Sequence, residues 1–142
     1  MENRSLPCII LMADDDQEDC FLARIAFEES GIKGEILFVE DGKDLLDYLR
    51  QQNGYSSSEK APRPDLILLD LNMPRLDGRK ALQVIKSDQG LKDIPVVILT
   101  TSRLEKDVKL CLDAGACDFK TKPVELNDWI DITRSAKSYC FA

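Results

Sequence analysis

Short apolar segments alternate along the chain with amphipathic segments of helical length, and this alternation constrains the fold more than any other feature. The apolar segments are rich in Ile, Leu and Val, a composition typical of strands that are buried on both faces of a parallel sheet. The alternation predicts a doubly wound α/β sandwich of three layers, with a five-stranded parallel sheet and right-handed crossovers. The predicted strands cover residues 7–13, 35–40, 65–70, 95–100 and, less clearly, 116–120.

The amphipathic segments begin with acidic residues, and several end near glycine, as helices commonly do. They predict helices over residues 16–30, 41–52, 77–88, 104–115 and 125–142. Between the second helix and the third strand, residues 53–64 are rich in Ser and Pro and predict a surface loop. A chain of 142 residues with 44% hydrophobic and 32% charged residues fits one globular domain. We therefore expect residues 1–142 to form a single domain with no second one after it.

The composition excludes several classes of function. The chain has no His, which removes Ser-His-Asp and Cys-His catalysis and imidazole metal ligands. Its net charge is −7 and it has no stripe of Lys and Arg, so nucleic acid is not an expected partner. No apolar stretch approaches the roughly 20 residues that span a bilayer, and a signal peptide is missing, so a cytoplasmic location is predicted.

The five cysteines are scattered and mostly lie in apolar contexts, with no C-x-x-C pair. This pattern argues against a zinc site and predicts reduced thiols in the core. The cysteines are Cys8, Cys20, Cys111, Cys117 and Cys140.

Polar side chains stand at the carboxyl ends of four of the five predicted strands. Asp14 and Asp15 follow the first strand, and Asp70 ends the third. Thr100 ends the fourth strand, and Lys122 follows the fifth. Each residue alone could be an ordinary turn, cap or surface group. Ligands of open α/β sheets bind outside the carboxyl ends of the strands, so together these residues predict a site.

The predicted site has the chemistry of metal-assisted phosphoryl transfer. Carboxylates held close together in a partly desolvated cleft need a compensating cation, and ligands that are all oxygen suit Mg²⁺. A carboxylate beside Mg²⁺ is a competent nucleophile towards a phosphoryl group, and Lys122 would offset the charge of the transferring oxygens. The third acid of the run, Asp16, is predicted to cap the first helix by accepting from the amide of Glu18 or Asp19.

Four motifs give the chain a resemblance to the receiver domain of two-component response regulators over nearly its whole length. They are "ADDD" (13–16), "LLDLNMPRLDG" (68–78), "VVILTTS" (96–102) and "FKTKP" (119–123). The resemblance implies a flavodoxin-like fold with strand order 2-1-3-4-5. It also implies a phosphorelay in which a histidine kinase or phosphotransfer protein is the donor. The loop before the third strand and the motif "LTTSR" are similar to those of regulators that are paired with phytochrome-type kinases.

The resemblance also implies roles for single residues at the acidic site. Asp70 would be the phosphoacceptor. Asp15 would bind Mg²⁺ directly, Asp14 through water, and Asn72 through its backbone carbonyl. Lys122 would pair with the phosphate.

Further implied features concern the switch that follows phosphorylation. The peptide bond between Lys122 and Pro123 would be cis. Thr100 and Phe119 would be the switch residues, and the face formed by the fourth helix, fifth strand and last helix would change shape and bind a downstream protein. Thr101 stands where this family more often has Ala.

Two other functions remain open from the residues. A pseudo-receiver would share the fold as a binding module without being phosphorylated, although the complete set of acidic residues argues against it. A phosphohydrolase of the haloacid dehalogenase type needs a second acid two residues after the nucleophile, where this chain has Asn72. A signalling domain that catalyses only its own phosphorylation and dephosphorylation, and is not otherwise an enzyme, is the leading hypothesis.

The last predicted helix carries apolar residues beside its core stripe. They are Ile132, Tyr139 and Phe141. A homodimer through this helix is one interpretation, and ordinary packing of a wide apolar stripe is another that the sequence leaves open.

Overall fold

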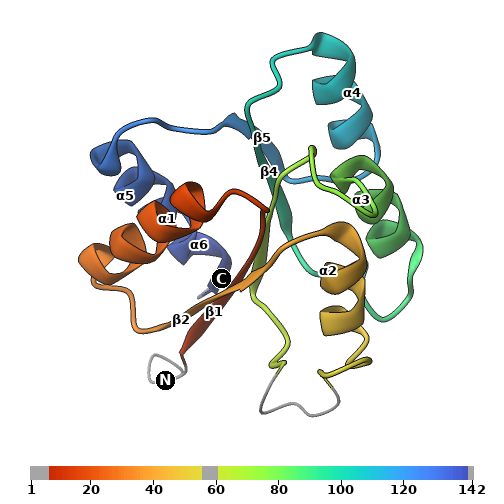
Figure 1. Cartoon of the computed structure of the whole chain (residues 1–142), viewed down its shortest axis with the longest axis horizontal. Helices are drawn as coiled ribbons and strands as arrows, with labels where there is room; N and C mark the ends of the chain where they lie inside the picture. The colour runs from red at the N-terminus through yellow and green to blue at the C-terminus, as the bar shows by residue number, and fades with distance from the viewer. Residues whose placement is uncertain (1–6, 56–60, 141–142) are drawn as a thin grey trace.

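Five parallel strands form one sheet in the order β2-β1-β3-β4-β5, in a computed structural model that describes residues 7–55 and 61–140 (Figure 1). The doubly wound architecture and the strand order are both as expected. The strands are β1 (Cys8–Ala13), β2 (Gly34–Val39), β3 (Leu66–Leu69), β4 (Val96–Thr100) and β5 (Asp118–Thr121).

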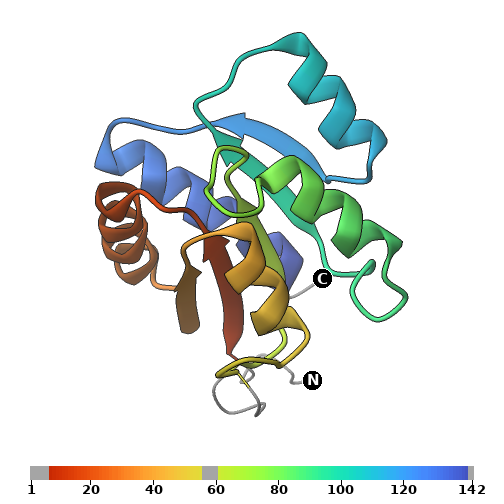
Figure 2. The same ribbon diagram turned by 45° about the vertical axis from the view of Figure 1, so that its right-hand side comes forward.

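The helices lie on both faces of the sheet; α1 to α4 connect the strands, and α5 and α6 follow the last one. They are α1 (Gln17–Ser30), α2 (Gly42–Leu49), α3 (Gly78–Ser87), α4 (Glu105–Asp113), α5 (Leu126–Ser135) and α6 (Lys137–Cys140). Figure 2 shows α2, α3 and α4 together on one face, in yellow, green and teal. Helices α1 and α5 pack on the opposite face (Figure 1).

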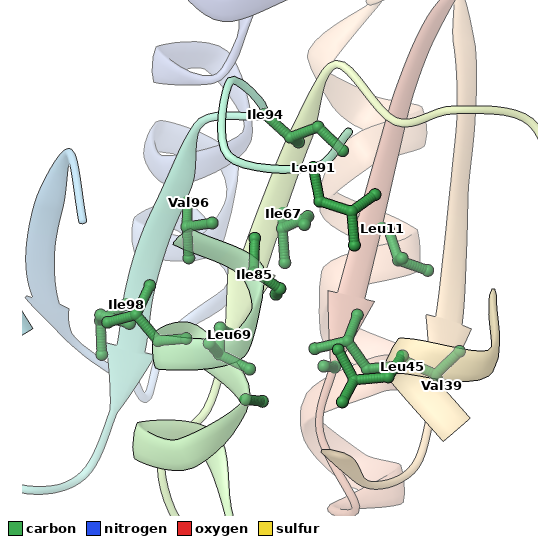
Figure 3. Close-up of a cluster of buried hydrophobic side chains, with 14 of the residues drawn as sticks. Leu11, Val39, Leu45, Ile67, Leu69, Ile85, Leu91, Ile94, Val96 and Ile98 are labelled. Carbon is green, nitrogen blue, oxygen red and sulfur yellow. The ribbon is translucent and has the colours of Figure 1, made fainter. Parts of the chain in front are cut away.

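Two hydrophobic clusters, one on each face of the sheet, explain why the central strands are apolar along most of their length. Leu11 and Ala13 of β1 belong to the cluster under α2 and α3, which Figure 3 shows. Ile10 and Met12 of the same strand belong to the cluster under α1 and α5. Because successive side chains of a strand point to opposite faces, a strand buried on both sides is apolar at nearly every position, and Thr100 at the end of β4 is the exception in these strands.

The predicted last helix over residues 125–142 is divided in the structure. Helix α5 ends at Ser135, and the short helix α6 follows it. The hydroxyls of Thr133 and Ser135 donate to the carbonyls of Ile130 and Ile132, at 2.9 and 2.6 Å. Side-chain hydroxyls that bond to carbonyls one turn back compete with the helical ladder and bend helices.

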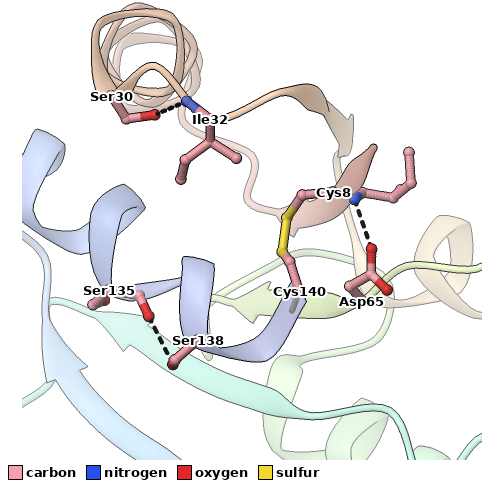
Figure 4. Close-up of a disulfide and its surroundings, with 8 residues drawn as sticks. Cys8, Ser30, Ile32, Asp65, Ser135, Ser138 and Cys140 are labelled. Carbon is pink, nitrogen blue, oxygen red and sulfur yellow. Dashed lines mark hydrogen bonds between the residues drawn. A yellow bond between two sulfur atoms is a disulfide. The ribbon is translucent and has the colours of Figure 1, made fainter. Parts of the chain in front are cut away.

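The prediction that every cysteine is reduced is wrong for one pair. Cys8 and Cys140 form a disulfide between the start of β1 and the end of α6 (Figure 4). Their Cα atoms are 5.3 Å apart, within the range that disulfides require. The doubly wound topology brings these two ends of the chain together, which the separation of 132 residues does not reveal. Cys20 and Cys111 are buried free thiols and Cys117 is an exposed one.

Two predicted features fall partly outside the described residues. Residues 56–60 of the predicted loop over 53–64 lie outside the described residues, and so does Phe141. On the described side of the loop, Ala61 is buried and Tyr48 Oη donates to the carbonyl of Pro62 at 2.8 Å. Among the described residues, no helix is both long and apolar enough to cross a membrane.

Candidate functional site

The pairing of β1 with β3 places two acids side by side at the carboxyl edge of the sheet. Ala13 pairs with Leu69, so Asp14 and Asp70 leave their strands at the same level. The amide of Asp70 donates to the carbonyl of Ala13 at 3.0 Å, which extends the ladder to the acid itself. Asp15 completes a group of three acids, and one carboxylate oxygen of each lies within 4.8 Å of the others.

Two of these three acids are almost completely removed from solvent. Asp14 is 1% exposed and Asp70 is 5% exposed, while Asp15 is open to solvent. Asp14 Oδ1 accepts from the amide of Asp16 at 2.9 Å. Burial raises the pKa of Asp14 to about 6, an effect that nearby Lys122 and the amide of Asp16 oppose without cancelling. The site therefore holds a carboxylate whose negative charge is costly without a cation.

Lys122 supplies a positive charge in the middle of the acids. Its Nζ donates to Asp70 Oδ2 at 3.1 Å and forms ion pairs with Asp14 Oδ2 at 2.9 Å and Asp19 Oδ2 at 2.8 Å. Burial lowers the pKa of Lys122, but its hydrogen bonds and charge interactions with the acids raise that pKa above its ordinary value. The side chain of Lys122 is 8% exposed, so the ammonium is a buried and fully charged group.

Asp19 is the member of this site that sequence reasoning missed. It stands in the first turn of α1, where acids are ordinary because they suit the positive end of the helix. Asp16 caps that helix as predicted, with its side chain accepting from the amide of Asp19 at 3.0 Å. The sequence signal that could have identified Asp19 was its position one helical turn after Asp15, since this spacing directs its side chain towards the same edge of the sheet.

The predicted switch residues lie on the next two strands of the sheet, β4 and β5. Thr100 is fully buried at the end of β4, and its Oγ1 accepts from the amide of Ser102 at 3.4 Å. The amide of Lys122 donates to the carbonyl of Thr100 at 2.9 Å, which ties the two strand ends together. Phe119 is half-buried and packs against the cluster under α2 and α3.

The remaining predicted residues flank the acids. Asn72 lies in the loop after β3, and its backbone N–H donates to Asp70 Oδ1 at 3.4 Å. Thr101 is exposed. The prediction of a cis bond between Lys122 and Pro123 is wrong, because the structure has no cis peptide among the residues it describes. The trans form is favoured before proline by about 0.5–1 kcal/mol, and Lys122 reaches the acids with it.

A second ion-pair network borders the site and was not predicted. Arg79 of α3 holds Asp107 of α4 through two contacts of 2.8 and 2.9 Å. Ser102 Oγ donates to the same carboxylate at 2.6 Å, which connects the network to the loop after Thr100. Asp107 is buried, and Arg79 and then Ser102 lower its pKa to about 2. The loop that follows β4 is thus fastened to two helices.

The acids fit a hard divalent cation. The donor set of Asp14, Asp15 and Asp70 consists of oxygen alone, as Mg²⁺ prefers. Asp14 Oδ2 is buried and accepts no hydrogen bond from the described residues, although it forms the ion pair with Lys122. Four carboxylates, including that of Asp19, against one ammonium leave a surplus of negative charge that a divalent cation would offset.

The chain is similar to known proteins over most of its length. Residues 10–134 match the family described as response regulator receiver domain. The response regulator Rcp1 of Synechocystis sp. is 38% identical over 133 residues, which cover 94% of this chain and 88% of Rcp1. The crystal structure of a phosphorylated cyanobacterial phytochrome response regulator, RcpA, has a TM-score of 0.86 and 37% identity, and the match covers 96% of each chain. The Mn²⁺-bound form of Rcp1 has a TM-score of 0.82 and 39% identity, with 93% of each chain covered.

Proposed function

The chain belongs to the receiver domain family of two-component response regulators, and from this premise we propose that it accepts a phosphoryl group on Asp70. The observation that supports this most directly is the convergence of Asp14, Asp15 and Asp70 with the buried ammonium of Lys122. The donor would be a histidine kinase or a phosphotransfer protein. RcpA is a phytochrome response regulator, which favours a phytochrome-type kinase as the donor.

Mg²⁺ is the proposed cofactor. Asp14, Asp15, Asp70 and the backbone carbonyl of Asn72 would hold it, and the Mn²⁺-bound form of Rcp1 supports a divalent ion in such a site. When bound, the ion would offset negative charge on the phosphoryl oxygens.

The proposed transfer uses groups that the chain already holds in place. An oxygen of the Asp70 carboxylate attacks phosphorus, the bond from phosphorus to the donor nitrogen breaks, and an acyl phosphate forms. Lys122 is already 3.1 Å from Asp70 Oδ2, so it needs little movement to pair with the new phosphoryl oxygens. Because the ammonium is buried, its interaction with those oxygens is stronger than it would be in water.

The phosphoryl group would then bias a two-state equilibrium of the β4 and β5 ends. A hydrogen bond from Thr100 and a charge-assisted contact from Lys122 together supply on the order of 2–4 kcal/mol. That is enough for a large shift of population without a complete one. The face of α4, β5 and α5 would carry the change to a downstream protein, with Phe119 following the movement.

A homodimer through α5 and α6 stays a prediction. Ile132 and Tyr139, two of the residues that motivate it, are half-buried against the cluster under α1 and α5.

Phosphorylation by a small donor tests the proposed function and separates it from a pseudo-receiver. The protein is incubated with Mg²⁺ and acetyl phosphate and its intact mass is compared with that of Asp70→Asn. We expect wild type alone to gain one phosphoryl group. Beryllofluoride, which imitates that group, should change the fluorescence of Trp129, which is fully buried in α5. A wild-type protein that ignores both reagents would be a binding module only.

A further inference from the structure

Lys122 has a third carboxylate partner that does not belong to the group of acids at the strand ends. The distance from its Nζ to Asp19 Oδ2 is 2.8 Å, the shortest of its three ion pairs. Asp19 comes from α1, whereas Asp14 and Asp70 follow strands of the sheet. Its side chain is 20% exposed, against 1% for Asp14 and 6% for Asp70. Asp19 therefore joins the site through the lysine and from its solvent side.

The acids that would hold a cation are at present shared with the lysine. Two of the three, Asp14 and Asp70, form ion pairs with Lys122. A divalent cation and Lys122 would thus compete for the oxygens of the same two carboxylates. A buried ammonium that loses its partners is costly, so Lys122 can release these oxygens only if another carboxylate stays with it.

We infer that Asp19 is a positioning residue that holds Lys122 while Asp14 and Asp70 turn to the cation. This inference rests on the proposed function of the site. With Asp19 present, the lysine and Asp19 form a neutral pair, and the three remaining carboxylates face the two charges of the ion. Without Asp19, Lys122 would be neutralised only by the metal ligands themselves, and the ion would have to displace it.

The local structure holds Asp19 in the required place. The amide of Asp19 donates to the capping side chain of Asp16 at 3.0 Å, which fixes the first turn of α1. An acid in this turn could also serve merely to complement the helix dipole. Glu18 provides the matched control, because it is an exposed acid in the same first turn and has the same charge. A dipole effect would be lost equally in Asp19→Asn and Glu18→Gln.

The first test compares each protein without and with Mg²⁺ and requires no phosphoryl donor. A buried ammonium with several carboxylate partners exchanges its protons slowly and gives a lysine NH₃⁺ signal in ¹H–¹⁵N spectra. The signal of Lys122 is identified by its absence in Lys122→Met. When Mg²⁺ is added, we expect the signal to be lost in Asp19→Asn, kept in Glu18→Gln and recovered in Asp19→Glu. A signal that survives the addition of Mg²⁺ in Asp19→Asn would overturn the inference.

The second test is a calorimetric titration of the same variants with Mg²⁺. Groups that orient metal-site residues are commonly worth tenfold or more in metal affinity, so we expect the Kd of Asp19→Asn to rise about tenfold. The Kd of Glu18→Gln should change less than about twofold, as for a screened surface charge. Equal affinities in Asp19→Asn and Glu18→Gln would overturn the inference alone. Failure of the wild type to bind Mg²⁺ would overturn the proposed metal site and this inference together.

Discussion

Asp14 is the residue at which burial and charge conflict most strongly. Its pKa is raised from an ordinary value of 3.8 to about 6, chiefly by burial. An acid whose folded-state pKa exceeds its unfolded value binds more protons in the folded state between those two values. The stability of the metal-free protein therefore decreases as pH rises through that window, and the full cost of the charge is present above it.

This decrease of stability with rising pH gives a testable prediction for Asp14→Asn. We expect the Tm of the variant minus that of wild type to increase as pH rises from about 4 to about 6.5, measured in EDTA by thermal unfolding. Comparing two proteins that differ at one residue cancels the titration of the other acids. A difference that does not depend on pH would show that Asp14 carries no such cost.

At the level of single residues, the sequence could identify the residues of the site but not the contacts between them. Asp14, Asp15, Asp70, Thr100 and Lys122 were predicted because each stands at the end of an apolar strand. Asp19 could not be distinguished from an ordinary acid at a helix start. Its ion pair with Lys122 depends on how α1 packs, which the order of residues does not specify.

Helices α3 and α4 are joined by a buried ion pair whose loss should destabilise the protein. Arg79→Met would leave Asp107 buried without its principal partner. Breaking such a pair typically costs about 3–5 kcal/mol, and the partial exposure of Arg79 brings our expectation to about 2–4 kcal/mol. Urea denaturation measures this change in the free energy of unfolding.

Two variants make the comparison specific. Lys109→Met removes a lysine of the same helix α4 whose partner, Asp113, is exposed, and no measurable change is expected. The double variant Arg79→Met/Asp107→Leu removes both charges and should be more stable than Arg79→Met. If the double variant is the less stable of the two, the cost does not come from an uncompensated charge.

Gly78 begins α3 directly beside the backbone of Asp70 and Leu71. A Cβ atom at this position would overlap the backbone carbonyl of Asp70 and the Cα of Leu71. Gly78→Ala must therefore push the Asp70 segment aside, and we expect it to cost about 2–3 kcal/mol and to slow labelling by acetyl phosphate. Gly90→Ala is the control, since its Cβ would meet only the side chain of Asp88. Equal stability and labelling rates in the two variants would contradict this role.

The strands and helices themselves were predictable because burial determines which residue types they contain. The three central strands are apolar except for Thr100 at the end of β4, since both of their faces are covered. The weaker pattern of β5 reflects its position at the edge of the sheet, where its four residues are half-buried or exposed. The division between α5 and α6 was not predictable, because it arises from hydroxyl contacts within a continuous apolar stripe.

Over the whole molecule, one covalent link joins the first strand to the last helix. Unfolded protein that contains the disulfide between Cys8 and Cys140 is restricted over 132 residues, which by chain entropy corresponds to about 4–5 kcal/mol. We expect the intact mass under non-reducing conditions to be lower by two hydrogen atoms than after reduction. Reduction should lower the Tm of wild type.

Cysteine variants test whether the decrease in Tm on reduction comes from the disulfide between Cys8 and Cys140. Cys140→Ala should abolish the response of Tm to the reductant, while Cys117→Ala, which removes an exposed free thiol, should keep it. A mass that does not change on reduction would exclude the disulfide. Cysteine spacing could not reveal this pair, because the two residues meet only once all five strands are in place.

The central claim is that Asp70 accepts a phosphoryl group, and chemical trapping tests it most directly. The protein is treated with acetyl phosphate and Mg²⁺ and then with borohydride, which reduces an aspartyl phosphate to homoserine. Peptide mass spectrometry then identifies the converted residue. Conversion at position 70, absent when Mg²⁺ is replaced by EDTA, is the predicted result. Conversion at Asp14 or Asp15, or none at any residue, would contradict the account.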